Sequence, residues 1–268
     1  MKKYITNFMK YKFLLTELVK KDIKLKYRRS KLGILWTLLE PILTTIVLTL
    51  VFGTIRNKGG SDSTFPVYIL TGRLLFQFFS QSTKAAARSI RSHHGMMRKV
   101  YVPKYMYPLG SVLSNFVTFL ISLIVLVGAC VIYKIHITGY IVLSIVPLIT
   151  LFLMTFGTGM ILATAQVFFR DVEYLWGVAT TLIMYCSGIF YKLEDLAGAG
   201  AKAGKGVLQL VLHWNPVYAT IYNFRCTVYY GQPLDAWYTF YGMAVAIATI
   251  TVGVWLFCKK QDEFILNL

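Results

Sequence analysis

The sequence predicts an all-α integral membrane protein with six transmembrane helices. Of its 268 residues, 56% are hydrophobic and only 15% are charged, which is too apolar for the surface of an ordinary soluble domain. Apolar runs recur along the chain, each close to or above the roughly 20 residues that cross a bilayer as a helix. They cover residues 33–55, 66–83, 107–133, 140–169, 174–190 and 237–258.

The distribution of positive charge supports this topology. Most of the 28 lysines and arginines precede the first run or follow the second, fourth and sixth runs, which all lie on one side of a six-span protein. Because lysine and arginine accumulate on the cytoplasmic side, both termini are expected in the cytoplasm. Membrane topology therefore explains the net charge of +17 better than nucleic-acid binding does.

The first 31 residues form a basic amphipathic segment ahead of the membrane domain, which spans residues 32–268. The segment has no compact apolar core, so no cleavable signal is expected. On a helical wheel, lysines cluster opposite an apolar face made of Tyr4, Phe8, Tyr11, Leu15 and Leu18. This sorting is typical of a helix lying in the membrane interface, and a plain basic stretch before an anchor would not require it. Asp22 on the apolar side predicts an end or a bend there.

Two connecting segments have structure of their own. Residues 84–108 begin with helix-favouring residues, contain Gly95 as a helix breaker, and could hold a short cytoplasmic helix that docks a protein or contacts lipid headgroups. Outside, residues 207–214 are too short to cross the membrane, and Asn215-Pro216 breaks that run. We therefore expect two short helices that dip into the outer leaflet over residues 207–230.

The glycine-rich stretch Glu194–Leu210 is not a nucleotide site. A P-loop needs Gly, four residues, then Gly-Lys-Ser/Thr, so that backbone N–H groups, a lysine and a hydroxyl meet the phosphates. Here Gly206 follows Gly204-Lys205, and Ala199 stands at the position of the first glycine. No metal site is expected either, because the four cysteines form no C-x-x-C pair and His93 and His94 are adjacent.

Four motifs follow one another along the six-span frame. They read "LKYRRSKLGILWTLLEPI" (25–42), "RKVYVPKYMYPL" (98–109), "VFFRDVEYL" (167–175) and "NPVYATIYNFR" (215–225). Together, and in this order, they resemble the permease subunit of type-2 ABC exporters for polysaccharides, the family of O-antigen, capsule and teichoic-acid exporters. The resemblance covers nearly the whole chain.

The resemblance implies an assembly in the prokaryotic cytoplasmic membrane. Two copies would form a pore and bind two separate ATP-binding cassette subunits, which carry ATP and Mg, so this chain binds no cofactor and is not itself an enzyme. Coupling to those subunits would fall to a coupling helix and a second loop, at Met96, Met97, Arg98, Lys99, Val100, Tyr101, Arg170 and Asp171. The interfacial helix and first-span entry would form a gate at Arg28, Arg29, Gly33, Trp36, Glu40 and Pro41.

The cargo would be a glycan or a lipid-linked glycan, whose sugar faces stack on aromatic rings while its hydroxyls use polar groups. Candidates for a channel are Trp36, Phe76, Phe78, Phe79, Tyr185, Phe190 and Tyr191, although each aromatic could instead contact lipid. Arg73, within the second run, either snorkels outward or meets anionic cargo. Glu40 is expected to face protein or a water pocket near Arg28 or Arg29, because an ionised carboxylate facing lipid is costly.

Some positions depart from the family pattern, and other functions remain open. "CSGIFYKLE" (186–194) lacks the prolines that relatives carry at the outer end of the fifth span, which affects the outer gate. A small-molecule permease of the wider type-2 ABC group and, less favoured, an integral-membrane glycosyltransferase are the alternatives. The sequence distinguishes neither among teichoic acid, capsule and O-antigen nor which ATPase is the partner.

Overall fold

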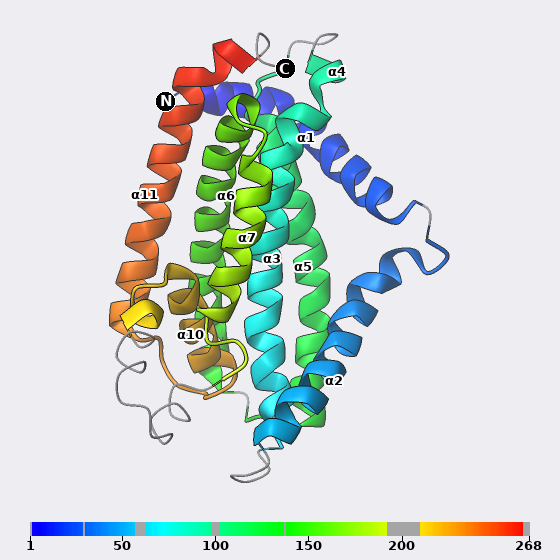
Figure 1. Cartoon of the computed structure of the whole chain (residues 1–268), viewed down its shortest axis with the longest axis vertical. Helices are drawn as coiled ribbons and strands as arrows, with labels where there is room; N and C mark the ends of the chain where they lie inside the picture. The colour runs from blue at the N-terminus through cyan, green and yellow to red at the C-terminus, as the bar shows by residue number, and fades with distance from the viewer. Residues whose placement is uncertain are drawn as a thin grey trace.

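Long helices run side by side through the structure, a computed structural model that describes residues 2–28, 30–56, 63–97, 102–136, 138–191 and 210–264. No strand occurs among these residues. Figure 1 shows α3, α5, α6, α7 and α11 packed together, with α1 across one end of the bundle and α10 near the other. The start of α1 and the end of α11 lie at the same end.

The N-terminal helix α1 spans Lys2–Tyr27 and is amphipathic as predicted. Its apolar side packs on protein, since Leu15 and Leu18 are buried in a cluster with residues of α3, α5 and α6. The side chains of Tyr4 and Phe8 lie outside the described part. The helix continues past Asp22 to Tyr27. The Asp22 carboxylate lies 4.0 Å from the His93 ring, inside the fold.

Within the described residues, four helical segments are long and apolar enough to cross a membrane. They are Gly33–Phe52, Met106–Ile132, Gly139–Phe168 and Ala236–Glu263, which contain α2 (Trp36–Arg56), α5 (Met106–Ile132), α6 (Ile145–Phe168) and α11 (Ala236–Lys260). Three of these segments also contain a short 3-10 helix: Gly33–Leu35 before α2, Gly139–Ser144 before α6 and Gln261–Glu263 after α11. The first, third, fourth and sixth predicted runs are therefore helices of spanning length.

The second predicted run is part of a longer helix. Helix α3 spans Phe65–Ser92, so it continues nine residues past residue 83. Ala85, Ala86 and Ala87 favour continuation of the helix beyond Lys84, because alanine has the highest helix propensity. At 28 residues, α3 is about 42 Å long. The chain turns at His93, and the four-residue helix α4 (His94–Met97) follows.

The fifth predicted run is helical over only part of its length. Helix α7 spans Val172–Tyr185, and the expectation of a span continuing to residue 190 is wrong. Gly188 adopts a left-handed backbone, with φ of 57°, which an α-helix cannot accommodate. Beyond the helix end, side chains from α3 and α10 bind the carbonyls of residues 188 and 189.

Near this turn, residues 210–213 are helical and α10 spans Pro216–Val228. At 13 residues α10 is about 20 Å long, which is too short to cross a membrane. Asn215 caps α10 with its side-chain oxygen, which accepts from the backbone N–H groups of Val217 and Tyr218. Residues 207–209 of the predicted outer helices lie outside the described part.

The backbones of helices α6 and α11 approach each other closely at two glycines. A Cβ added at Gly157 would lie 2.5 Å from the backbone nitrogen of Ile250, and one at Gly253 would lie 2.6 Å from the carbonyl oxygen of Gly157. Small residues that allow backbones to touch are how helices associate where lipid removes the hydrophobic driving force.

Candidate functional site

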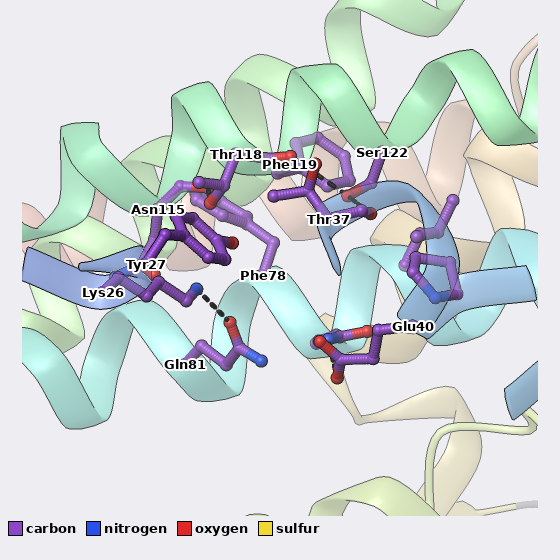
Figure 2. A pocket seen from close by; sticks show the side chains of 13 residues that line it. Lys26, Tyr27, Thr37, Glu40, Phe78, Gln81, Asn115, Thr118, Phe119 and Ser122 are labelled. Atoms are coloured by element: carbon purple, nitrogen blue, oxygen red, sulfur yellow. Dashed lines mark hydrogen bonds between the residues drawn. The ribbon is translucent and has the colours of Figure 1, made fainter. Parts of the chain in front are cut away.

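A polar cavity lies where the end of α1 and the start of α2 meet α3 and α5 (Figure 2). Its polar lining comprises Lys26, Tyr27, Thr37, Glu40, Gln77, Gln81, Asn115, Thr118 and Ser122. Lys26 donates to the Gln81 side-chain oxygen at 3.3 Å, and Ser122 donates to the Thr37 carbonyl at 3.0 Å. Burial lowers the pKa of Lys26, against the opposing effect of Glu40.

Glu40 faces this cavity, as the sequence led us to expect. Its carboxylate accepts from the Gln77 amide at 2.8 Å. The basic residue in the lining is Lys26 rather than Arg28, whose side chain is exposed. Arg29 lies outside the described residues.

A second cavity of about 200 Å³ continues from the first between α2, α3 and α7. Both cavities share Glu40, Gln77 and Gln81, and the second adds Arg73, Phe76, Ser80, Met184, Ile189 and Phe190. Arg73 Nε and Gln77 Oε1 are buried without a hydrogen-bond partner in the described part of the chain. Because unpaired buried polar atoms are costly, they suit a site that is filled by water or a polar ligand.

The two cavities lie along one polar face of α3. Arg73, Gln77 and Gln81 recur every four residues and so share one face of the helix. Lys84 and Arg88 continue the same face toward α4. We call the two joined cavities, lined by Lys26, Glu40, Arg73, Gln77 and Gln81, the polar groove.

The predicted channel aromatics fall into three groups. Phe76 and Phe190 line the second cavity. Trp36 and Tyr185 are exposed on the outside of the chain, and the Tyr191 hydroxyl donates to the Tyr185 carbonyl at 2.7 Å.

Phe78 and Phe79 belong to the core of the bundle. Phe79 is 2% exposed and packs on Trp176, with ring centroids 6.2 Å apart. Phe78 is 3% exposed and stacks on Phe119 at 5.1 Å, and it also borders the first cavity. Phe79 lines neither cavity, and its assignment as a cargo contact stays a prediction.

The other predicted gate residues shape the entry to α2. Gly33 adopts φ of 54°, which turns the chain out of α1 and into α2. Pro41 is buried within α2 and also lines the first cavity.

The predicted coupling residues that the structure describes lie at the α1 end of the bundle. Met96 and Met97 of α4 pack, half-buried, against the cluster that holds Leu15 and Leu18. Arg170 and Asp171 are exposed in the turn between α6 and α7, at the same end as α4 (Figure 1). Residues 98–101 lie outside the described part.

That turn is tied to α3. Glu173 pairs with Arg88 and accepts from the Gln166 amide at 2.7 Å. The exposed loop and the end of α3 are therefore linked through side chains.

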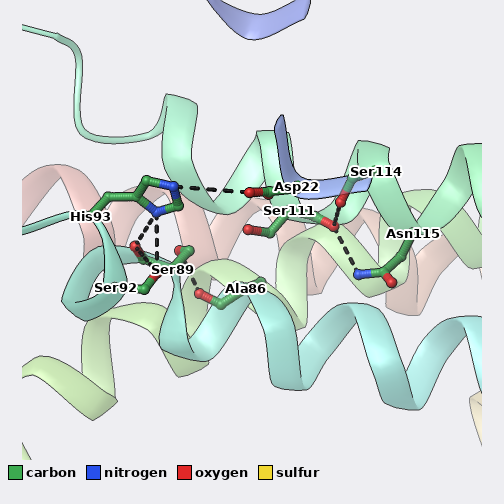
Figure 3. Close-up of polar contacts among 8 residues, drawn as sticks. All are labelled: Asp22, Ala86, Ser89, Ser92, His93, Ser111, Ser114 and Asn115. Atoms are coloured by element: carbon green, nitrogen blue, oxygen red, sulfur yellow. Dashed lines mark hydrogen bonds and ion pairs between the residues drawn. The ribbon is translucent and has the colours of Figure 1, made fainter. Parts of the chain in front are cut away.

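A second link joins α1 to α3 and α5 (Figure 3). His93 Nδ1 lies 2.9 Å from the Ser89 carbonyl, which can only accept, so Nδ1 carries a proton and Nε2 faces Asp22 at 4.0 Å. The His93 ring stacks on Tyr107 of α5 at 5.0 Å. Burial raises the pKa of the Asp22 carboxyl, and His93, Lys21 and Ser111 act in the opposite direction.

The sequence reasoning missed Arg225 and Asn215 as functional candidates. Arg225 is 2% exposed, and its guanidinium binds backbone of α3 and of the turn after α7. The Asn215 amide donates to the Cys186 carbonyl at 2.8 Å, in the same turn. An arginine inside a short aromatic helix that follows an Asn-Pro cap was the available signal.

Metal chemistry finds no support in the described ranges, where no three His, Cys, Asp or Glu side chains group as a metal site would require. What the residues do provide is a helical membrane bundle with a polar groove along one of its helices. This arrangement is that of a membrane transport protein.

The chain belongs to the ABC-2 type transporter family, whose pattern it matches over residues 14–229. It is 27% identical over 262 residues to the O-antigen export system permease protein RfbA of Myxococcus xanthus, covering 97% of each chain. It is 25% identical to RfbA of Klebsiella pneumoniae, covering 94% of this chain and 93% of that one. The polysialic acid transport protein KpsM of Escherichia coli is 21% identical, over 92% of this chain and 93% of its own.

These comparisons confirm the resemblance that the four motifs carried. The chain is similar to the permeases of type-2 ABC polysaccharide exporters from end to end. Its role as a transport subunit rather than an enzyme agrees with every relative named above.

Proposed function

We propose that this chain is the permease half of an ATP-driven exporter that moves a polysaccharide from the cytoplasm to the outer face of the membrane. The polar groove carries the proposal, because a hydrated polymer needs a lined path through hydrocarbon. Its amide and carboxylate groups suit sugar hydroxyls, and Phe76 and Phe190 offer ring faces to the same cavity.

In the proposed topology, α3 and α7 cross the membrane with the four apolar helices, which leaves both termini in the cytoplasm. The length of α3, about 42 Å, exceeds the roughly 30 Å of hydrocarbon, so Lys84 and Arg88 would stand on the cytoplasmic side. Helix α7 would complete its crossing through the turn at residues 186–191. Residues 210–228 would re-enter the outer leaflet without crossing it.

ATP and Mg would be bound by two separate ATP-binding subunits, and two copies of this chain would form the pore. The docking surface would include α4 and the exposed Arg170-Asp171 turn, because both lie at the proposed cytoplasmic end. Residues 98–101, which follow α4 in the sequence, would contribute to it. The Arg88–Glu173 pair supports this assignment, since it would carry a movement of the docked loop to α3.

The cargo would pass Arg73, whose Nε is buried and unpaired in the described part of the chain. A guanidinium binds phosphate and carboxylate groups strongly, so the groove suits an anionic polymer or one linked to a lipid pyrophosphate. Capsule, O-antigen and teichoic-acid-type polymers all remain within this class.

Replacing Arg73 with Gln tests the role of the groove. In cells that depend on this chain for export, Arg73→Gln should lower the surface polymer while the chain still inserts and assembles. Arg91→Gln is the matched control, because Arg91 is exposed near the end of the same helix, outside the groove. Wild-type export from Arg73→Gln would remove Arg73 from the cargo path.

A further inference from the structure

The Arg225 guanidinium is held in a cage of four oxygen atoms. Its Nη1 donates to the Gly188 carbonyl at 2.8 Å, and Nη2 donates to the Tyr68 carbonyl at 2.9 Å and the Ile189 carbonyl at 3.4 Å. Its Nε donates to the Thr71 hydroxyl at 3.3 Å. The guanidinium carbon also lies 3.5 Å from the centre of the Tyr68 ring.

This cage contains no carboxylate in the described part of the chain. A buried charge without an ion-pair partner is costly unless polar groups surround it. The carbonyls of residues 188 and 189 are free for this purpose because α7 ends at Tyr185. The arginine and the turn therefore depend on each other.

Neighbouring residues are fitted to the same arrangement. A Cβ at Gly72 would lie 2.4 Å from Arg225 Nη2, so only glycine leaves room for the guanidinium. The Tyr68 hydroxyl donates to the carbonyls of Gly188 and Tyr191 at 3.2 and 3.0 Å. Three elements, α3, α10 and the turn after α7, are thus joined at one point.

The turn that Arg225 binds contains Phe190, which lies at the polar groove. Ile189 is 1% exposed, which anchors the residue before Phe190. The Phe190 ring stacks on Phe52 of α2, with centroids 4.9 Å apart and planes within 15°. Phe190 also lines the cavity that contains Glu40 and Arg73.

We infer that Arg225 is a positioning residue that holds the end of α7 so that Phe190 stays against Phe52 and closes the groove at its α10 end. The ring contact is the part that can open, since stacking is weak beside four hydrogen bonds to a charged group. That this contact gates cargo rests on the proposed function of the groove. The inference about the position of Phe190 is independent of that function.

Cysteine crosslinking measures that position directly. In a chain with its four native cysteines replaced by alanine, Phe52→Cys and Phe190→Cys are joined in membranes by a short thiol-specific reagent. Arg225→Gln, Arg225→Lys and Gly72→Ala are then added separately. Gly128→Ala is the control, because a Cβ there meets no atom within 4 Å.

All three variants should lower the crosslinking yield several-fold, and the control should not. Lysine cannot rescue Arg225, because one ammonium does not span acceptors on α3 and on the turn. Gly72→Ala keeps the arginine and displaces only its guanidinium, so it separates position from charge.

The thermal stability of each variant in detergent decides between positioning and mere folding. Lower crosslinking with wild-type stability in Gly72→Ala supports the inference. Unchanged crosslinking in Gly72→Ala and Arg225→Gln overturns it, and so does a loss of yield that only follows a loss of folded protein. Because the readout needs neither ATP nor cargo, it stands even if the export function fails its own test.

Discussion

The contact between α6 and α11 makes a quantitative prediction. In Gly157→Ala, the new Cβ would lie 2.5 Å from the Ile250 nitrogen and the Thr249 carbonyl carbon, whereas ordinary contacts begin near 3.4 Å. The clash is with backbone on the opposite helix, so no side chain can move aside. The two helices must separate locally by about 1 Å, within a tightly packed region.

Two terms set the size of the effect. Overpacking of this kind costs about 1–3 kcal/mol, partly because a gap of that width forfeits a quarter to a half of the dispersion energy at the contact. Alanine in place of glycine returns up to about 1 kcal/mol through helix propensity. Gly128→Ala in α5 gains the same propensity without any clash, so it isolates the packing term.

Unfolding in mixed detergent measures both variants. Gly157→Ala should be less stable than Gly128→Ala by about 1–3 kcal/mol, the overpacking term alone. Equal stability of the two variants would refute the close approach of α6 and α11.

Further predictions concern the two ends of the bundle. Because burial raises the pKa of Asp22 above its ordinary 3.8, the folded state binds this proton more tightly than the unfolded state. The wild-type free energy of unfolding should therefore fall as the pH rises through that raised pKa, and Asp22→Asn should lack this component when unfolding is followed from acid to neutral pH. Arg88→Glu or Glu173→Arg should each impair ATP-dependent export, the combined charge exchange should restore it, and unfolding should change by no more than about 1 kcal/mol, since the pair is partly exposed. Asn215→Asp should keep the α10 cap and lose the donor to Cys186, so it should be more stable than Asn215→Ala by about 1 kcal/mol in thermal unfolding; equal losses would assign all of the effect to the amide.

The apolar runs predicted α2, α5, α6 and α11 within a few residues, because about 20 consecutive apolar residues determine a spanning helix locally. The ends of α3 and α7 were misplaced for different reasons. Hydropathy stops at Lys84, whereas the helix continues through the alanines that follow. The turn after α7 is bound by Arg225, 40 positions beyond Tyr185, and the sequence near the helix end could not predict that contact. Gly188 was the local signal for the turn.

The functional residues divide in the same way. Glu40 and Arg73 were found because they are charged residues within apolar runs, where a charge is costly and therefore marks a candidate functional site. That they line one cavity follows from the packing of α2 on α3. Periodicity alone could not separate Phe76, which lines the second cavity, from Phe79, which does not, because both are buried in one aromatic run of α3.

Co-purification with an ATP-binding subunit tests the central claim most directly. The tagged chain is expressed with the ATP-binding subunit encoded beside it, and the molecular mass of the purified complex is measured in solution. We expect a complex with two copies of each subunit that is lost when residues 98–101 are replaced by alanine, while the α4 residues remain. Purification of the wild-type chain alone, with the ATP-binding subunit left in the soluble fraction, would contradict the account of this protein as half of an ATP-driven exporter.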